Sequence, residues 1–449
     1  MSMPQVRSSR FTFTSWQVLD GQASVAFSFH CDQFGDFTET VSWPVAPEEL
    51  AQYFEGGGRA IGDLLWVALG VSYYKAGAAR HIDLPPLPAA GRAMAEALYT
   101  EGLAEFFVRA ELPYPADIEF SGPVTDDTLR RPDRVEPGAA LVAFGGGKDS
   151  YVARAILQQA GEDMRLVSAT LSGAVQSVLR ATAPDEITFI ERALDASLAG
   201  ASAAGFNGHV PITAINMLLL SVLGAIKGYP QVVFANERSA DEPTMKMGTV
   251  VANHQFSKSG PFETHLRQAM LAADPDTPRP YSILRPYSEA WIGRAFARLK
   301  AAHPKFTSCN RNFRLAGDAE KRWCGRCAKC AFTSLILAPY LNRQEAKVAF
   351  GAAFLDAPEL LSFYEELCGL TDHKPWDCVG TIDECRASLW RASQSADWQD
   401  SLAVTQLLPK VSRILNDEEL ESIWLRALEP DDGTLVPATY LRAGEDLSR

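Results

Sequence analysis

Six consecutive residues in the first half of the chain have the types and spacing of an anion-binding loop: Gly145, Gly146, Gly147, Lys148, Asp149 and Ser150. An apolar run at residues 139–144 precedes them and predicts a buried strand, and a helical pattern begins near Asp149. Backbone N–H groups at the start of a helix lack intrahelical partners, and the helix dipole adds partial positive charge there. Glycine lets a phosphate approach the backbone closely, while Ser150 offers a hydroxyl and Lys148 a positive charge. The loop therefore suits a nucleotide.

Two widespread nucleotide-binding motifs do not fit this loop. A Walker A motif requires a glycine five residues before the Gly–Lys pair and a serine or threonine directly after the lysine. Val142 and Asp149 occupy those positions. A dinucleotide-binding fingerprint requires a third glycine where Ser150 stands. The loop therefore belongs to neither class.

Four of the eight cysteines are clustered in a pattern typical of a metal site. Cys309, Cys324, Cys327 and Cys330 have the spacing Cys-x14-Cys-x2-Cys-x2-Cys. Four thiolates can enclose a tetrahedral Zn²⁺, and protein ligands at all four positions indicate a structural ion. Four unligated cysteines, a redox-active Cys-x2-Cys pair and an iron–sulfur cluster are the alternatives.

The acidic composition argues against a partner held by a broad positive field. The net charge is −13, with 42 Lys and Arg residues against 55 Asp and Glu residues. This disfavours a nucleic-acid partner, and an anionic substrate would need local positive charge. One basic stretch either supplies that charge or is a solvated surface; it contains Lys305, Arg311, Arg314, Lys321, Arg322, Arg326 and Lys329.

The composition is that of an ordinary globular protein, with 449 residues of which 47% are hydrophobic and 22% charged. The longest apolar stretch, residues 212–226, contains Asn216 and Ser221 and is too short to span a membrane. Residues 1–16 include no apolar secretory segment. We therefore expect a cytoplasmic protein without a membrane partner.

The elements that position the loop and the cysteines follow from hydrophobic periodicity. Residues 10–43 alternate in polarity, which predicts antiparallel strands, and residues 47–107 have a helical pattern with a buried helix that ends near Gly77. Beyond residue 139, expected strands alternate with helices, which favours a parallel α/β sheet. The expected strands lie at residues 139–144, 165–172, 231–236 and within 281–288, and the expected helices at 212–227, at 289–300 and throughout the chain after residue 343.

Three domains are expected from this pattern. An N-terminal α+β domain spans residues 1–135 and ends in a loop rich in Pro, Asp and Arg. An α/β nucleotide-binding domain that contains the glycine loop and the four cysteines spans residues 136–345. A helical C-terminal region spans residues 346–449.

The glycine loop resembles the pyrophosphate loop of the ATP pyrophosphatases, Ser-Gly-Gly-x-Asp-Ser. Every fixed position matches except the first, where Gly145 replaces serine. The resemblance implies a parallel sheet of the adenine-nucleotide alpha-hydrolase type, bound ATP and Mg²⁺, and a position for Asp149 near the triphosphate. Enzymes of this superfamily adenylate a substrate oxygen and release pyrophosphate. Among them, the 7-cyano-7-deazaguanine synthases have a similar zinc-binding Cys…Cys-Gly-Arg-Cys-x2-Cys element.

Three further stretches are similar to the ATP-dependent UDP-N-acetylmuramoyl-L-alanyl-L-glutamate epimerases of bacterial peptidoglycan synthesis. They are GVSYYKAG at residues 70–77, GFNGHVPITAINMLLLS at 205–221 and FANERSADEPT at 234–244. The resemblance covers most of the chain, including an N-terminal part that the deazaguanine synthases lack. It implies that UDP-N-acetylmuramoyl-L-alanyl-L-glutamate is the substrate and that its terminal L-glutamate is inverted to D-glutamate. Adenylation of the glutamate carboxylate would acidify the α-proton, and hydrolysis after inversion would release AMP.

Such a reaction needs acid–base residues near the loop. Besides Asp149, we consider Glu237 and Arg238, because they follow an expected strand at the sheet edge that lines ligand crevices, and His209, which lies in a polar break before an apolar helix. His209 is alternatively a capping or core histidine, Glu237 a Mg²⁺ ligand or ion-pair partner, and Arg238 a carboxylate clamp or a surface ion pair. Lys258 and Tyr73 are further candidates.

Two other functions are compatible with the loop. An adenylating amide or thio ligase related to 7-cyano-7-deazaguanine synthase would require ammonia or a sulfur donor. A nucleotide-binding sensor would bind ATP without releasing pyrophosphate.

Overall fold

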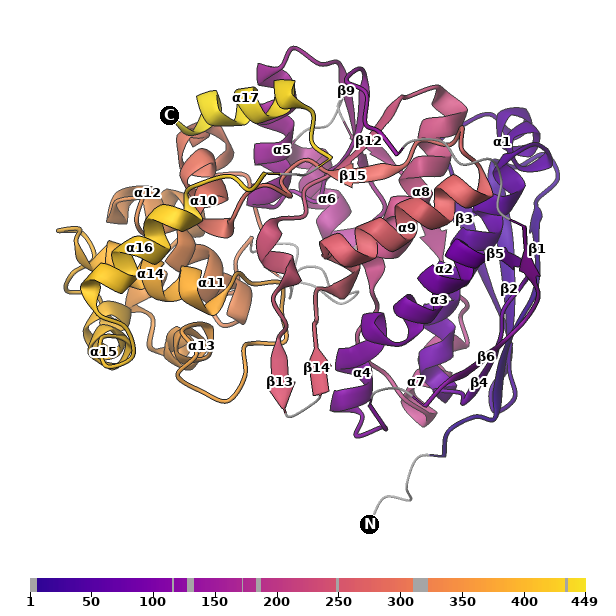
Figure 1. The fold of residues 1–449 in the computed structure, drawn as a ribbon, viewed down its shortest axis with the longest axis horizontal. Helices are drawn as coiled ribbons and strands as arrows, with labels where there is room; N and C mark the ends of the chain where they lie inside the picture. Colours follow the sequence, from indigo (N-terminus) through magenta and orange to yellow (C-terminus); the bar gives the residue numbers. More distant parts are fainter. Residues whose placement is uncertain are drawn as a thin grey trace.

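The structure, a computed structural model, describes residues 6–114, 117–126, 133–171, 173–182, 187–247, 250–309, 322–432 and 435–449. A sheet built from the N-terminal part lies at one side of the molecule, a helical C-terminal region lies at the other, and a second sheet lies between them (Figure 1). This arrangement confirms the expected mixed α/β fold and the helical C-terminal region.

The N-terminal sheet contains the antiparallel strands that the alternating sequence predicts. β1 (Arg10–Val18), β2 (Ser24–Cys31) and β3 (Gly35–Ser42) pair in chain order, and their inward side chains, such as Phe11, Phe27 and Val41, are fully buried. The hydrophobic side chains of this face are buried by helices packed against it. The sheet continues in parallel beyond β1 through β4 (His81–Asp83) and β6 (Glu119–Ser121).

Among the described residues, four α-helices belong to this N-terminal part. The longest, α2 (Gly58–Gly77), packs on β1 and β2 and is buried along almost its whole length, and it ends at Gly77 as expected. The next residue, Ala78, adopts a left-handed conformation with φ of 45° that stops the helix. The other helices are α1 (Pro47–Glu55), α3 (Ala89–Tyr99) and α4 (Ala104–Arg109), and β5 (Leu87–Pro88) pairs with β7 (Val124–Thr125).

The second sheet is parallel throughout, as the alternation of strands and helices predicts. Its strand order is β10-β9-β8-β12-β15, so the order reverses between β8 and β12. In an open parallel sheet, such a reversal leaves a crevice at the carboxyl ends of the two strands. The strands are β8 (Ala140–Ala143), β9 (Met164–Ser168), β10 (Ile187–Phe189), β12 (Gln231–Phe234) and β15 (Pro280–Ser282).

The parallel sheet separates two hydrophobic cores. Ala140, Val142 and Val233 face one core, which extends through the C-terminal helices, whereas Leu141 and Val232 face the other, which extends into the N-terminal sheet. Adjacent residues of each strand therefore point into different cores, as the two-residue repeat of a strand requires. Strands buried on both faces explain why these segments read as unbroken apolar runs.

Helices cover both faces of the parallel sheet. α5 (Lys148–Gln159), α10 (Glu289–Arg298) and α17 (Ala438–Ser448) pack together, and α8 (Ile212–Lys227) packs on β8, β12 and β15 and on α2. α8 has the bounds that its apolar sequence predicts. The other helices of this part are α6 (Gly173–Thr182), α7 (Leu198–Ala204) and α9 (Gly260–Ala273), and a hairpin is formed by β13 (Met245–Met247) and β14 (Val250–Ala252).

Helices make up most of the described chain after residue 327, so they begin before residue 346, the expected start of the C-terminal region. They are α11 (Ala328–Leu337), α12 (Arg343–Phe350), α13 (Leu361–Leu367), α14 (Ile382–Ser393), α15 (Leu402–Val411), α16 (Asp417–Ala427) and α17. Among the described residues, no helix combines the length and apolarity needed to cross a bilayer.

Some strands differ from expectation. β9 ends at Ser168, before the expected end at residue 172, and only Tyr281 and Ser282 of the fourth expected segment (281–288) belong to a strand, β15. Pro286 has no backbone N–H to donate to a neighbouring strand, and Ser288 is already the N-cap of α10, so the strand cannot continue through this segment. A further short strand, β11 (Glu191–Ala193), lies between β10 and β12 in the chain but pairs antiparallel with β3 of the N-terminal sheet instead of joining the parallel sheet.

We predict that Gly205→Ala destabilises the protein, because a Cβ atom there would lie 2.0 Å from the carbonyl oxygen of Ala76. Relief of this overlap requires backbone movement, so the free energy of unfolding should fall by about 1–3 kcal/mol. Gly200→Ala in α7 is the matched control, because no atom lies within 4 Å of its Cβ position. The control should raise stability slightly, since alanine favours a helix over glycine by about 0.5–1 kcal/mol. Urea denaturation of both variants measures the difference, and equal stability would contradict this packing.

Candidate functional site

The glycine loop lies at the reversal point of the parallel sheet. It connects the end of β8 to α5, and Gly146 has a φ of +75° that favours glycine. The helix begins at Lys148, one residue before the expected start, with Gly147 as its N-cap. The Ser150 hydroxyl donates to the Gly147 carbonyl (2.8 Å) and so closes the first turn. The backbone at the head of α5 therefore faces the crevice where a ligand of an open α/β sheet binds.

The segment before Cys309 supports this loop from the other side. The Thr307 N–H donates to the Gly146 carbonyl (2.9 Å). A Cβ atom at Gly147 would lie 2.9 Å from the Ser308 Oγ atom, so the two segments approach too closely for a side chain. The loop conformation is thus tied to the segment that leads into the cysteine cluster.

A cavity of about 1070 Å³ opens in front of the loop. Its wall includes Gly145, Gly147, Asp149 and Ser150 from the loop and Asn236 after β12. Its volume is that of a large ligand site. The wall also includes Arg192 of β11 and Lys75 of α2.

Lys148 points away from the cavity into the protein. Its side chain is 1% exposed, and its ammonium contacts the carboxylates of Asp149 and Glu289. Burial alone would lower the pKa of Lys148, but these two carboxylates raise it above its usual value. The positive charge that the sequence offers to a phosphate is therefore neutralised by protein groups in this structure.

Three carboxylates meet beside the loop. Oxygen atoms of Asp149, Glu237 and Glu289 lie within 4.8 Å of one another, and each residue lies in or just before the first turn of a helix. Burial, together with Asp149 and Glu237, raises the pKa of Glu289 to about 8 against the effect of Lys148. The pKa of Asp149 is lowered, because Lys148 and Lys329 outweigh its burial. A group of carboxylate oxygens at this spacing fits a divalent cation such as Mg²⁺.

His209 belongs to a different cluster. Its Nδ1 atom lies 3.5 Å from a carboxylate oxygen of Glu105, and its ring lies 4.4 Å from that of His254. Burial, reinforced by His254, lowers the pKa of His209 to about 3, so this histidine is neutral. Glu105 accepts a hydrogen bond from Nδ1 of His254, which lowers the pKa of Glu105 against its burial.

The remaining acid–base candidates lie in three places. Arg238 forms an ion pair with Asp431 near the C-terminus instead of facing the cavity. Tyr73 is buried in the N-terminal core, where its hydroxyl accepts from the Asp195 N–H (3.2 Å). Lys258 lines the cavity, and the thiol of Cys378, Glu237 and Asp149 raise its pKa against the effect of burial.

The four clustered cysteines converge as their spacing predicts. The Sγ–Sγ distances are 3.9 Å for Cys309–Cys327, 3.8 Å for Cys324–Cys330 and 3.5 Å for Cys327–Cys330. Zn–S bonds of about 2.3 Å in a tetrahedron place sulfur atoms about 3.8 Å apart. All four atoms lie within 4.8 Å of one another, so the arrangement fits a zinc ion held by protein ligands alone.

The basic stretch does not act as one patch. Lys329, which lies between two of the cysteines, is buried and lines the cavity. Arg322 donates to the backbone carbonyls of Phe306 (3.0 Å) and Ala349 (3.2 Å). Lys305 and Arg326 are exposed. Arg311, Arg314 and Lys321 lie outside the described residues.

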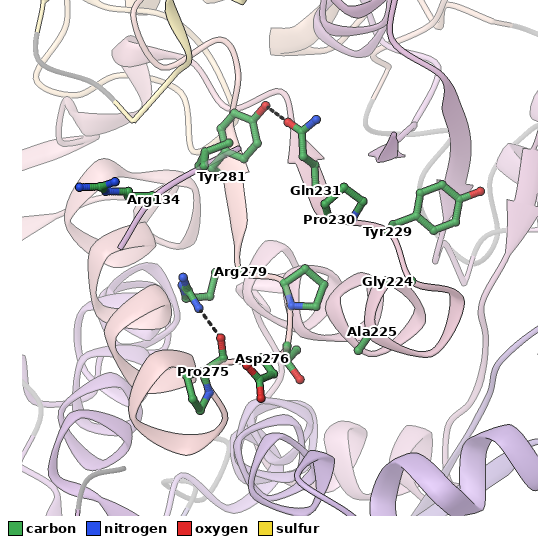
Figure 2. A pocket seen from close by; sticks show the side chains of 14 residues that line it. Arg134, Gly224, Ala225, Tyr229, Pro230, Gln231, Pro275, Asp276, Arg279 and Tyr281 are labelled. Carbon is green, nitrogen blue, oxygen red and sulfur yellow. Dashed lines mark hydrogen bonds between the residues drawn. The ribbon is translucent and has the colours of Figure 1, made fainter. Parts of the chain in front are cut away.

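A second cavity of about 350 Å³ lies near the C-terminal end of α8 (Figure 2). There, Arg279 donates to the Pro275 carbonyl (3.1 Å) and the Tyr281 hydroxyl donates to Gln231 (2.8 Å). These polar groups are already paired with one another, and the glycine loop is absent from this wall. We therefore place the candidate site in the larger cavity.

Sequence reasoning missed several residues at the larger cavity or beside it, among them Glu289, Cys378 and His254. Glu289 starts α10, Cys378 stands in a connection before α14, and His254 follows β14. None has a spacing relative to the glycine loop that would single it out. Their proximity arises from the folding of segments more than 100 residues from the loop.

Comparison with known proteins identifies one family over most of the chain. The profile of the MurL N-terminal domain matches residues 3–283, and that of the MurL C-terminal domain matches residues 305–422. The chain belongs to the MurL family, and the family expected from its sequence stretches is thereby confirmed.

Three curated relatives are similar over nearly their full length, and each is named UDP-N-acetyl-alpha-D-muramoyl-L-alanyl-L-glutamate epimerase. The protein from Micromonospora sp. is 34% identical, with 97% of this chain and 98% of the relative covered. The protein from Salinispora tropica is 35% identical, with 90% and 89% covered. The protein from Xanthomonas oryzae pv. oryzae is 34% identical, with 98% and 97% covered.

We predict that Cys327→Ala removes most of the zinc from the purified protein and lowers its stability by several kcal/mol, because three thiolates cannot close the tetrahedron. Elemental analysis and thermal unfolding measure both effects. Cys368→Ala is the control, since Cys368 is buried in the same core but lies outside the cluster. A Cys327→Ala protein that retains full zinc content would contradict the assignment.

Proposed function

We propose that this protein catalyses the ATP-dependent epimerisation of the terminal L-glutamate of UDP-N-acetylmuramoyl-L-alanyl-L-glutamate in peptidoglycan synthesis. The observation that carries the proposal is the glycine loop at the reversal point of the parallel sheet, which opens with Asp149 into the 1070 Å³ cavity. The names of the three curated relatives supply the substrate and the outcome.

The loop supports a role in binding the phosphates of ATP. The first N–H groups of a helix lack intrahelical partners, so the head of α5, which has no side-chain cap, favours an anion. We infer that the strand, loop and helix here belong to a sheet of the adenine-nucleotide alpha-hydrolase type, and the order of β8, the loop and α5 supports this. Asp149, Glu237 and Glu289 are the residues that would hold Mg²⁺. When bound, the cation neutralises the charge that develops on the pyrophosphate leaving group.

Adenylation explains why an epimerase would need ATP. Removal of an α-proton next to a free carboxylate places a second negative charge beside the first. Attack of the glutamate carboxylate on the α-phosphate of ATP forms an acyl-adenylate and releases pyrophosphate. The acyl carbonyl then accepts the electron pair of the broken C–H bond, and a proton returns to the opposite face. Water finally attacks the acyl carbonyl, which yields the D-glutamyl product and AMP.

The part of the cavity wall that contains Arg192 suits an anionic substrate. The Arg192 side chain is 1% exposed and its Nε donates to Glu39 (2.6 Å), but both of its Nη atoms lack a hydrogen-bond partner among the described residues. A buried guanidinium with two unused nitrogen atoms favours an anionic ligand such as the diphosphate of a nucleotide sugar.

The proposal is tested by incubating the protein with ATP, Mg²⁺ and the L-glutamyl nucleotide, then measuring pyrophosphate, AMP and glutamate chirality. We expect all three changes without ammonia or a sulfur donor. Product formation that depends on ammonia or sulfide would instead identify an adenylating ligase. ATP binding without pyrophosphate release would identify a sensor. Absence of D-glutamate would overturn the proposed function.

We predict that Asp149→Asn reduces pyrophosphate release by on the order of 100-fold or more, because it removes a charge from the phosphate site while conserving shape. Asp163→Asn is the control, since Asp163 is exposed and lies outside the cavity wall. Wild-type pyrophosphate release by the Asp149→Asn variant would show that the loop does not hold the reacting phosphates.

We further predict that Arg192→Lys raises the KM for the L-glutamyl nucleotide about 10-fold and leaves the KM for ATP unchanged, since lysine keeps the charge beside Glu39 but loses the guanidinium fork. Arg165→Lys, at an exposed position of β9, is the control. Steady-state kinetics with each substrate varied in turn measure the effect. An equal rise in both KM values would exclude a specific role in holding the nucleotide sugar.

A further inference from the structure

Cys378 lies in the wall of the cavity that contains the glycine loop. It stands in the connection between α13 and α14, yet it shares this wall with Gly145, Asp149 and Lys258. It is not one of the clustered cysteines and forms no disulfide in the structure. The Cys378 thiol is therefore positioned to take part in a reaction in this cavity.

The backbone on both sides of Cys378 is fixed. Its N–H donates to the Asp377 carboxylate (2.8 Å), and its carbonyl accepts from the ammonium of Lys329. The next carbonyl, that of Val379, accepts from the Gln255 side chain (2.9 Å). These three bonds hold the thiol in a defined position, which general acid–base catalysis requires before a suitable pKa has any use.

A histidine–carboxylate pair adjoins the thiol. The Sγ atom of Cys378 and a ring nitrogen of His254 lie within 4.8 Å of each other, with Asp377 in the same group. Glu105 accepts from Nδ1 of His254, which leaves Nε2 for the thiol. Cys378, His254 and Glu105 thus form a chain in which a carboxylate orients an imidazole and the imidazole adjoins a thiol.

The charges around the thiol favour its ionised form. Burial raises the pKa of a thiol, but Lys258, followed by His254 and Lys329, brings the pKa of Cys378 down to about 7. Burial lowers the pKa of an imidazole, but Cys378 and Glu105 raise that of His254 to about 10. At neutral pH the pair therefore contains a substantial fraction of thiolate beside an imidazolium.

We propose that Cys378 is the general base that removes the α-proton of the adenylated glutamate, with His254 as its positioning residue. This inference rests on the proposed epimerase function. The thiolate forms an S–H bond as the Cα–H bond breaks, and the electron pair moves onto the acyl carbonyl oxygen. A second Brønsted acid on the opposite face returns a proton to Cα, and the thiol proton exchanges with solvent.

The test is Cys378→Ser in the full-length protein, assayed in D₂O with ATP, Mg²⁺ and the L-glutamyl nucleotide. Deuterium incorporation at the glutamate α-carbon reports proton removal, and pyrophosphate release in the first turnover reports adenylation. We expect deuterium incorporation to fall at least about 100-fold, as for loss of a general base, while first-turnover pyrophosphate release is retained. Cys31→Ala in the N-terminal sheet is the control and should change neither measurement.

A second variant separates the positioning role from a structural one. His254→Asn should shift the acidic limb of the pH profile for deuterium incorporation to higher pH, because the thiolate loses one cation while Lys258, Lys329 and Asp377 still face it. A variant that is merely less stable would lower the rate without moving this limb.

Several outcomes overturn the assignment while leaving the epimerase function intact. The first two are deuterium incorporation at the wild-type rate by Cys378→Ser, and loss of pyrophosphate release together with deuterium incorporation in a folded Cys378→Ser protein. The other two are a covalent substrate adduct on Cys378 of the wild-type protein, and loss of a bound metal ion from Cys378→Ser. If the wild-type protein itself produces no D-glutamate, the proposed function fails instead.

Discussion

The constraint on which the site depends is the burial of opposite charges at the carboxyl edge of the parallel sheet. Lys148 is nearly inaccessible and is neutralised by Asp149 and Glu289, which come from the first turns of α5 and α10. A buried ammonium without such partners would carry a large desolvation cost. Because the pair joins two helices that begin at this edge, it fixes their starts relative to each other. The carboxylate of Asp149 is thereby held at the cavity beside the N–H groups of its own helix.

The cysteine cluster contributes to the same site from the other side. Just before Cys309, Thr307 donates a hydrogen bond to the Gly146 carbonyl and Ser308 lies close to Gly147. Lys329, between Cys327 and Cys330, binds the backbone of Cys378. A structural metal in this cluster would therefore fix both the proposed phosphate site and the proposed base. A metal ion with four protein ligands has no open coordination position for a substrate. It would influence the proposed reaction only by holding the glycine loop and Cys378 in place.

The parts of the site that could be predicted from the sequence are those encoded locally. The glycine loop and the cysteines have short, fixed spacings, and α8 is an apolar run whose bounds follow from its composition. The Lys148 side chain points into the protein and pairs with Glu289 because α10 packs against α5. No local sequence pattern predicts this contact between two distant helices. His209 illustrates the same limit, because its partners, Glu105 and His254, come from α4 and from the segment after β14. For the same reason, the pairing of β11 with β3 could not be predicted from three residues.

The position of β11 has a consequence for the order in which the chain folds during synthesis. Until residues 191–193 leave the ribosome, β3 is an unpaired edge strand with free N–H and C=O groups. The antiparallel strands are thus translated about 150 residues before the segment that covers their edge. A nascent chain in this interval exposes a strand edge that favours pairing with another copy.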